Sequence, residues 1–238
     1  MDEGLRAKEP SRIAGMFDAI AGRYDLLNRV LSGGLDQRWR RRAIKSLRLT
    51  GRETLLDLCT GTADVALAAI RARPPAARVV GIDFSHQMLR VGLGKVRRRG
   101  VWPRVGLVRG DAVSLPLGDA SVDAATIAFG IRNVQEPAAA CQELARVVRK
   151  GGRLAVLEFG LPRSPFWRGA YIWYSSRMLP AIGRLVSRHQ SAYEYLPESV
   201  GRFPPPEEFG LLLQKSGFPH VTIVPLTLGV VYLYAAER

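Results

Sequence analysis

The stretch Asp57-Leu58-Cys59-Thr60-Gly61-Thr62-Ala63-Asp64 decides the fold, because it joins an apolar run to a helical pattern through a short turn. Residues 54–59 before the turn predict a buried strand, and residues 64–73 after it predict a helix. Gly61 in the turn lets a ligand approach the backbone, and the first N–H groups of the helix offer donors. Asp57 is placed to accept a hydrogen bond from a cationic amino group. Closing the strand before an ordinary turn is an equal alternative for Asp57.

Short apolar runs alternate with helical patterns on the C-terminal side of this turn. Further strands are predicted at 78–83, 105–109, 124–129 and 153–158, with helices at 85–99 and 135–149. Lys150-Gly151-Gly152 predicts the end of the last of these helices. The runs 219–225 and 228–236 predict an antiparallel hairpin. The fold expected is α/β and Rossmann-like: a doubly wound, mostly parallel, seven-stranded sheet.

The composition is that of one globular domain covering residues 1–238. Hydrophobic residues make up 47% and charged residues 24% of the 238. The net charge of +14 suggests nucleic acid, but arginines run through the whole chain, so no specific nucleic-acid surface is expected. An anionic membrane surface is at least as good a partner. The sequence leaves the oligomeric state open, a homo-oligomer included.

The location expected is the cytoplasm, at the inner face of the cell membrane as a peripheral protein. The N-terminus has no apolar core typical of a secretory signal. The longest uncharged run, 221–236, is too short for a membrane helix and contains Pro225. Cys59 and Cys141 are too few for a disulfide framework, and no Cys/His cluster has metal-ligand spacing, so no metal is expected.

A second acidic position points to a nucleoside ligand. Asp83 closes the next predicted strand, 22 residues beyond Gly61, the spacing at which a carboxylate reaches a ribose hydroxyl. Capping the following helix is the alternative, although Ser85 is equally placed for it. The turn lacks the Gly-x-Gly-x-x-Gly pattern and a Walker lysine, so a phosphate-binding loop is poorly supported. S-adenosylmethionine has no phosphate and fits this turn better.

A third motif follows the third predicted strand. In Arg109-Gly110-Asp111-Ala112, Asp111 is placed to accept from the exocyclic amine of adenine, and the Ala112 backbone is placed to donate to the ring. The alternative is that Asp111 is a plain turn residue. The order of the three motifs favours the adenine interpretation.

The chain resembles the ubiquinone/menaquinone biosynthesis C-methyltransferases nearly from end to end. This family methylates a ring carbon of a polyprenylated quinol and has the class I fold of S-adenosylmethionine-dependent methyltransferases. Besides the three motifs above, the resemblance is carried by Phe17-Asp18, Arg23-Tyr24-Asp25-Leu26-Leu27-Asn28, Asp36 with Arg38-Trp39-Arg40, Phe129-Gly130-Ile131-Arg132-Asn133-Val134, Leu157-Glu158-Phe159, Tyr195-Leu196-Pro197-Glu198-Ser199 and Phe203-Pro204.

The resemblance implies cofactor contacts from Thr62, Asp83, Asp111 and Ala112, with the Ala128 backbone nearby. The chain departs from the family pattern at several positions. Ala63 stands where many members have a second glycine, a small-for-small change that should leave the turn intact. Leu228 and Tyr234 stand where glycine and histidine are expected, which removes any acid–base role for that histidine. Ser187-Arg188-His189 also differs from the expected segment.

Carbon methylation requires an electron-rich ring carbon, which a quinol provides once a hydroxyl is ionised. Phenolic hydroxyls have a pKa near ~10, so the protein must stabilise the oxyanion or supply a base. Arg132 and Asn133 follow the fourth strand, at the edge where such sheets bind ligands. The hypothesis is that Arg132 stabilises the developing phenolate, because arginine is a poor base, and that Asn133 orients a water or a ring oxygen. A structural ion pair is the alternative role of Arg132.

Two helical regions are expected to surround the substrate. Residues 1–50 would form a lid, in which Tyr24 and Asp25 are weaker candidates for closing over the substrate. Tyr195 and Glu198 are candidates for the same role on the other side, and a structural role is an equal alternative for each of these four residues. Residues 159–193 contain no acidic residue and read as a helical insertion that lines a channel for the prenyl tail and touches lipid headgroups. An amphipathic helix packed on the sheet is the alternative.

Demethylmenaquinol is the substrate that the sequence favours, because no transit peptide is seen and menaquinone is common in bacteria. The alternatives are a ubiquinone-precursor benzoquinol, RNA or another small molecule. A binding protein that has kept the fold and lost activity is a further alternative. Against it, every expected cofactor position is filled.

Overall fold

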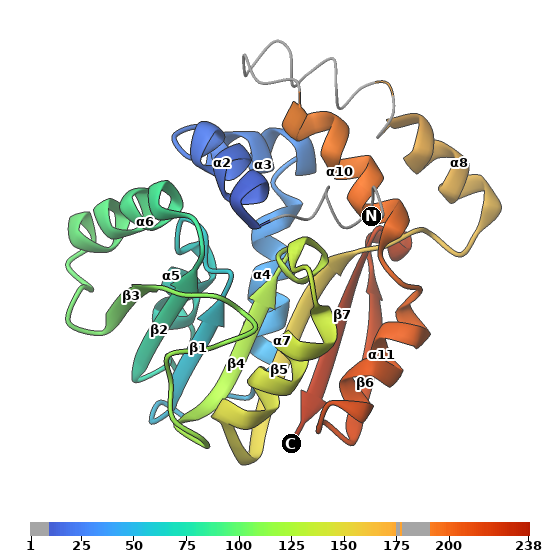
Figure 1. The fold of residues 1–238 in the computed structure, drawn as a ribbon. Helices are drawn as coiled ribbons and strands as arrows, with labels where there is room; N and C mark the ends of the chain where they lie inside the picture. Colours follow the sequence, from blue (N-terminus) through green and yellow to red (C-terminus); the bar gives the residue numbers. More distant parts are fainter. Residues whose placement is uncertain (1–9, 175–176, 178–190) are drawn as a thin grey trace.

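A seven-stranded sheet forms the centre of the protein (Figure 1). The computed structural model describes residues 10–174, 177 and 191–238. The strand order is β3-β2-β1-β4-β5-β7-β6, and β7 runs antiparallel to both of its neighbours while the other pairs are parallel. The strands are β1 Thr54–Leu58, β2 Arg78–Asp83, β3 Val105–Arg109, β4 Val122–Ala128, β5 Val148–Phe159, β6 His220–Leu226 and β7 Val231–Glu237. The predicted doubly wound sheet and its terminal hairpin are confirmed.

The expected helix stop before β5 is wrong in its position. The helix ends at Val147, and Gly151 and Gly152 lie inside β5 instead of ending the helix. The register with β4 shifts between Val122 and Ala124, so the strand bulges there. A Cβ on Gly152 would lie 2.5 Å from Val148 Cγ1 and 2.7 Å from the Asp123 carbonyl oxygen. The glycine pair therefore permits a tight bulge, which has the same sequence pattern as a helix stop.

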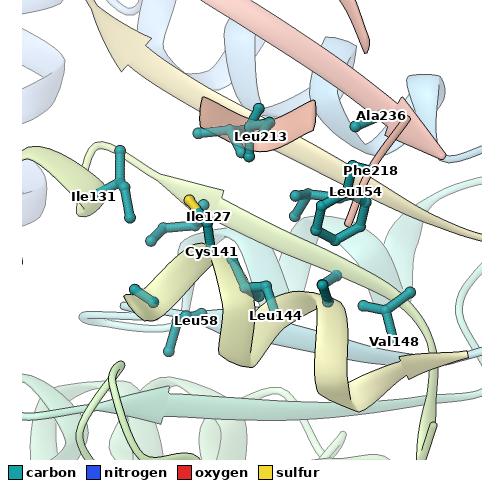
Figure 2. Close-up of a cluster of buried hydrophobic side chains, with 14 of the residues drawn as sticks. Leu58, Ile127, Ile131, Cys141, Leu144, Val148, Leu154, Leu213, Phe218 and Ala236 are labelled. Carbon is teal, nitrogen blue, oxygen red and sulfur yellow. The ribbon is translucent and has the colours of Figure 1, made fainter. Parts of the chain in front are cut away.

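Helices cover both faces of the sheet. One face packs against α7 and α11, where Cys141 and Leu144 of α7 and Leu213 of α11 lie in the cluster drawn in Figure 2. Trp39, Ile44 and other apolar residues of α4 and α5 form the core on the opposite face. The helices of these two layers are α4 Leu35–Ser46, α5 Asp64–Arg71, α6 His86–Arg98, α7 Pro137–Val147 and α11 Pro206–Lys215.

A third group of helices lies at the carboxyl edge of the parallel strands. The group consists of α2 Pro10–Ile20, α3 Tyr24–Ser32, α8 Pro165–Trp173 and α10 Ser191–Arg202 (Figure 1). The expected insertion 159–193 therefore begins with a helix, while 175–176 and 178–190 lie outside the described residues, as does the departure at Ser187-Arg188-His189. Among the described residues, no helix is both long and apolar enough to cross a membrane.

The strand order reverses between β1 and β4, whose carboxyl ends open beneath α2 and α3. In open α/β sheets, ligands bind in the crevice at this switch point. The short 3-10 turn Ile131–Asn133 follows β4 there. The topology thus brings the ends of β1, β2, β3 and β4 to one edge, under the N-terminal helices.

Candidate functional site

The ends of β1 and β4 have unusual backbone geometry. Cys59, Ala63 and Phe129 all have positive φ, at 52°, 65° and 60°, and Gly61 has φ 54°. Side chains other than glycine's are strained in this region, and such residues gather at functional sites. Ala63 has this conformation in the turn, and a glycine would adopt it without strain. Gly130 has no space for a side chain, since a Cβ would lie 2.3 Å from Cys59 Cβ.

Asp83 holds the turn and faces the pocket above it. Its Oδ2 accepts from the Gly61 backbone N–H at 2.8 Å, and its Oδ1 accepts from the Ser85 N–H at 2.8 Å. Burial raises the pKa of Asp83. Each carboxylate oxygen has two acceptor positions, so both oxygens keep one for a ligand. Ser85 caps the next helix by accepting from the Met88 N–H, so Asp83 is not needed as the cap, and its contact with a ribose stays a prediction.

Asp57 and Thr62 lie behind the turn. The Asp57 carboxylate, 1% exposed, accepts from Thr60 Oγ1 at 2.6 Å, Thr126 Oγ1 at 2.9 Å and the Ala66 N–H at 3.1 Å. The Thr62 hydroxyl donates to Asp25 Oδ1 at 2.5 Å. Neither residue is among the described residues that line the pocket. Their direct contact with a cofactor stays a prediction, and the geometry gives both a role in positioning the turn.

The buried Asp57 should make stability depend on pH. Burial raises the pKa of Asp57 to about 6, against the opposing effect of its hydrogen bonds. The folded protein therefore keeps a proton that the unfolded chain releases between about pH 4 and 6, and the free energy of unfolding falls across this window by on the order of 3 kcal/mol. In Asp57→Asn we expect the free energy of unfolding to lose this decrease, as measured by urea denaturation at a series of pH values from about 4 to 7. The exposed Asp119→Asn serves as control, and equal profiles for all three proteins would contradict the assignment.

Predicted cofactor residues converge on one pocket, which we call the carboxyl-edge pocket. It contains about 980 Å³ of empty space, open mouth included, and is lined by Gly61, Asp83, Asp111, Ala112 and Ala128, together with Ile82, Met88 and residues of α2 and α3. Two carboxylates on apolar walls suit a ligand with hydroxyl or amine donors and a flat ring. Asp111 Oδ1 accepts from the Val113 N–H at 3.1 Å, so the turn fixes this carboxylate. The residues present therefore fit S-adenosylmethionine.

The helices α2 and α3, which we call the lid, are tied to α6 and to the turn after β1 by two carboxylates. Asp18 Oδ1 accepts from Ser85 Oγ at 2.5 Å and from the Gln87 N–H at 3.0 Å, at the start of α6. Asp25 Oδ2 lies 2.6 Å from Lys95 Nζ, which also contacts Asp64 and the Thr62 hydroxyl. The lid is therefore latched to the glycine turn by a mostly buried cation.

Breaking this latch should weaken cofactor binding. In Lys95→Met, Asp25 and Asp64 lose the cation between them, at a cost to the closed lid of about 1–2 kcal/mol for a partly buried pair. We expect affinity for S-adenosylmethionine to fall about tenfold by calorimetry and proteolysis within α2 and α3 to accelerate. The matched control is Lys45→Met on the exposed surface of α4. An unchanged affinity in the Lys95 variant would show that the latch does not control the pocket.

A second pocket, the aromatic pocket, adjoins the first. It holds about 1040 Å³ of empty space between the lid, α4 and the ends of β4 and β5. Phe17, Tyr24 and Phe129 line both pockets. The remaining walls include Trp39, Phe159, Tyr171, Tyr174 and Tyr195, with Asp36, Arg40 and Arg132 as charged groups. Because the two pockets share three rings, a flat molecule in the aromatic pocket would lie next to a ligand in the carboxyl-edge pocket.

Arg132 is a buried cation at this junction. Its Nη1 donates to Glu158 Oε1 at 2.6 Å and to the Phe129 carbonyl oxygen at 2.7 Å, and its Nε donates to Ser199 Oγ at 3.3 Å. The guanidinium lies 5.3 Å from the centre of the Phe159 ring. The other terminal nitrogen, Nη2, makes no hydrogen bond within the described part of the chain. The arginine is therefore a structural ion-pair partner that also lines the aromatic pocket.

The remaining predicted residues differ in their placement. Asn133 lines the carboxyl-edge pocket, and its Oδ1 accepts from the Tyr195 hydroxyl at 3.0 Å. Tyr24 and Tyr195 line the aromatic pocket. Glu198 is exposed, pairs with Arg202 at 2.7 Å and lines neither pocket, so a direct substrate contact from Glu198 has no support in this geometry.

The sequence motifs assign no role to Glu158 and Lys95, although the pattern around each of them indicates a buried charge. Glu158 lies in the apolar run of β5, where a buried carboxylate requires a cation. Lys95 lies seven residues after Met88 on the buried face of α6. A charge on an apolar face predicts a buried partner, but which partner it has depends on the tertiary fold. Groups of three or more His, Cys, Asp or Glu suited to a metal ion are absent from the described residues.

The two C-terminal departures have structural explanations. Leu228 has φ 60° and is exposed, so the glycine expected there would relieve a strained turn. Tyr234 is buried, with its ring 4.9 Å from that of Phe209, and packs in the core. Neither residue lines the carboxyl-edge or the aromatic pocket.

Comparison with known proteins agrees with this geometry. The model of the ubiE/COQ5 methyltransferase family matches residues 5–238. The ubiquinone/menaquinone biosynthesis C-methyltransferase UbiE of Syntrophotalea carbinolica is 49% identical, over 94% of this chain and 92% of that protein. The demethylmenaquinone methyltransferase of Thermus thermophilus is 45% identical, over 94% of this chain and 100% of that protein.

A solved structure shows the same fold at low sequence identity. An S-adenosylmethionine-dependent methyltransferase from Aquifex aeolicus has a TM-score of 0.61 and 20% identity, covering 96% of this chain and 97% of the other. The expected class I fold is thereby confirmed, and the family match confirms the activity class, an S-adenosylmethionine-dependent methyltransferase. The family resemblance inferred from the motifs is also confirmed, and the chain belongs to the ubiE/COQ5 methyltransferase family.

Proposed function

We propose that this protein transfers the methyl group of S-adenosylmethionine to a ring carbon of a polyprenylated quinol, with demethylmenaquinol as the acceptor. The names of its relatives, which include a demethylmenaquinone methyltransferase, support this acceptor. The observation that carries the proposal is the junction of the two pockets at Phe17, Tyr24 and Phe129. A quinol ring lying against these side chains would be next to the cofactor.

The carboxyl-edge pocket is proposed to hold the cofactor, which when bound supplies an electrophilic sulfonium methyl group. Asp83 would accept from the ribose hydroxyls, and Asp111 with the Ala112 backbone would bind the adenine. Gly61 and the Ala128 backbone would allow the methionine portion to lie close to the ends of β1 and β4. Thr62 and Asp57 would act from behind, by fixing the turn that these contacts require.

The aromatic pocket is proposed to bind and activate the quinol. Arg132 would stabilise the oxyanion through its Nη2 group, because its other nitrogens are occupied by Glu158, Phe129 and Ser199. The developing negative charge on the oxygen would increase electron density at the neighbouring ring carbon, which is the carbon proposed to accept the methyl group. Asn133, held by the Tyr195 hydroxyl, would orient a ring oxygen or a water. The low-dielectric walls strengthen these interactions.

The arrangement of the chain around the site is also part of the proposal. Residues 1–238 would form a single domain in which α2 and α3, within the expected region 1–50, serve as the lid and 159–193 face the prenyl tail. Phe166 and Trp167 of this insertion are exposed large apolar side chains, which suits contact with a membrane surface. The protein would thus work in the cytoplasm, peripheral to the inner face of the cell membrane.

The direct test supplies three acceptors with labelled S-adenosylmethionine: demethylmenaquinol, a demethylated benzoquinol and bulk RNA. Label on a carbon of the naphthoquinol ring is the expected result. Label on the benzoquinol alone would show that the acceptor is a ubiquinone precursor instead of demethylmenaquinol. Label on RNA alone, or tight cofactor binding without transfer to any of the three, would refute the proposed acceptor while leaving the cofactor site in place.

A further inference from the structure

Two charged side chains of α4 lie in the aromatic pocket with unsatisfied polar atoms. Asp36 is 3% exposed and Arg40 is 7% exposed, and the two are one helical turn apart. Asp36 Oδ1 accepts from the Ser32 hydroxyl at 3.1 Å. Asp36 Oδ2 and Arg40 Nε have no hydrogen-bond partner among the described residues. The two atoms form an ion pair at 3.8 Å, which is too long for a hydrogen bond between them.

Orphaned polar atoms are costly in a buried position, so this pair indicates a missing partner. The Arg40 guanidinium lies 5.7 Å from the centre of the Phe129 ring, a ring that also borders the carboxyl-edge pocket. Both Asp36 and Arg40 line the aromatic pocket, in which Arg132 lies against the Phe159 ring. The two residues therefore belong to the wall of the pocket that would hold the acceptor ring.

The pair differs from Arg132 in the chemistry that it can recognise. A carboxylate oxygen only accepts a hydrogen bond, and the Nε–H of arginine only donates one. A hydroxyl satisfies both groups, because its O–H donates a hydrogen bond to the carboxylate and its oxygen accepts one from the Nε–H. A carbonyl oxygen satisfies only the arginine and leaves its own lone pairs facing the carboxylate.

We propose that Asp36 and Arg40 bind one ring hydroxyl of the acceptor and thereby select the quinol over the corresponding quinone. This inference rests on the proposed function and adds a second polar anchor to Arg132. A quinol has two hydroxyl groups, so one anchor for each would fix the ring in its plane. Asp36 then determines which redox state binds, while Arg40 strengthens the binding of either state.

The experiment measures binding of a short-chain demethylnaphthoquinol in its reduced form, without oxygen, and of its oxidised quinone. Both titrations contain S-adenosylhomocysteine, so that no methyl group is transferred. The wild-type protein is expected to bind the reduced form at least about tenfold more tightly, as one charge-assisted hydrogen bond provides. In Asp36→Asn the ratio of the two affinities should fall toward one, with cofactor affinity unchanged. Arg42→Ala, on the exposed surface of the same helix, should keep the preference.

A second variant keeps the test decisive. Arg40→Lys retains the charge next to Asp36 but removes the Nε–H donor, so it should weaken both forms about equally and leave their ratio intact. If Asp36→Asn does not fold, the test rests on Arg40→Lys. Binding of both forms to Arg40→Lys with the wild-type affinities would overturn the proposal. A folded Asp36→Asn with the wild-type ratio would also overturn it. If the wild-type protein methylates no quinol, the proposed function has failed. If the wild-type protein methylates a quinol but Asp36→Asn keeps the wild-type ratio of affinities, this inference alone has failed.

Discussion

Replacing Arg132 by methionine is expected to lower the free energy of unfolding by about 3–5 kcal/mol, because it leaves Glu158 as an unpaired buried charge. Glu158 has no exposed surface and accepts from Arg132 at 2.6 Å. In the fraction that still folds, turnover should fall about 10²–10³-fold, the effect of removing a group that stabilises a developing oxyanion. Chemical denaturation and single-turnover methyl transfer measure the two effects separately.

A double-mutant cycle separates the structural role of Arg132 from its role in turnover. Glu158→Gln removes the carboxylate charge, so the double variant Arg132→Met/Glu158→Gln should recover much of the lost stability. Turnover should not recover, because the oxyanion still has no cation. Normal turnover in a stable double variant would restrict Arg132 to the structural role that its contacts already establish.

Asp83→Ala is expected to weaken binding of S-adenosylmethionine about a thousandfold. Two hydrogen bonds from ribose hydroxyls to a carboxylate are each worth about 1.5–3 kcal/mol, and the variant also loses the acceptors for the Gly61 and Ser85 N–H groups. Calorimetry with the cofactor measures the loss directly. Asp119→Ala, an exposed carboxylate on the loop before β4, is the control. A loss of less than tenfold would place the ribose elsewhere in the carboxyl-edge pocket.

The sheet could be predicted because its physical cause is local. Each buried parallel strand is a short apolar run, and Asp83 lies at a fixed distance after Gly61 because β1, α5 and β2 form one compact unit. The sequence pattern does not predict helices α10 and α11, since Pro197 lies inside the first of them and the second begins directly after Pro204 and Pro205. The bulge at Gly152 was also missed, because glycine pairs occur at helix ends as well.

The site was predictable only in part, for a different reason. Motif positions identified Asp83, Asp111 and Arg132, but the sequence does not show which buried charges meet. Asp25 and Lys95 are 70 residues apart in the chain, and Arg132 and Glu158 are 26 apart. Asp36 and Arg40 are neighbours on one helix, where a surface ion pair is the ordinary interpretation. Only the packing of α4 against the aromatic pocket shows that both are buried and unsatisfied.

The position of Cys59 has a consequence for the chemical durability of the protein. Its side chain lines the carboxyl-edge pocket, and burial together with the carboxylates of Asp83 and Asp57 raises the pKa of the thiol well above its usual value. Quinones are electrophiles that alkylate thiolates but react slowly with protonated thiols. An enzyme whose proposed substrate oxidises to such an electrophile would thus be protected from self-inactivation by the burial of this thiol and by the carboxylates near it. Slow alkylation of Cys59 by iodoacetamide at pH 8, followed by mass spectrometry, is the expected observation.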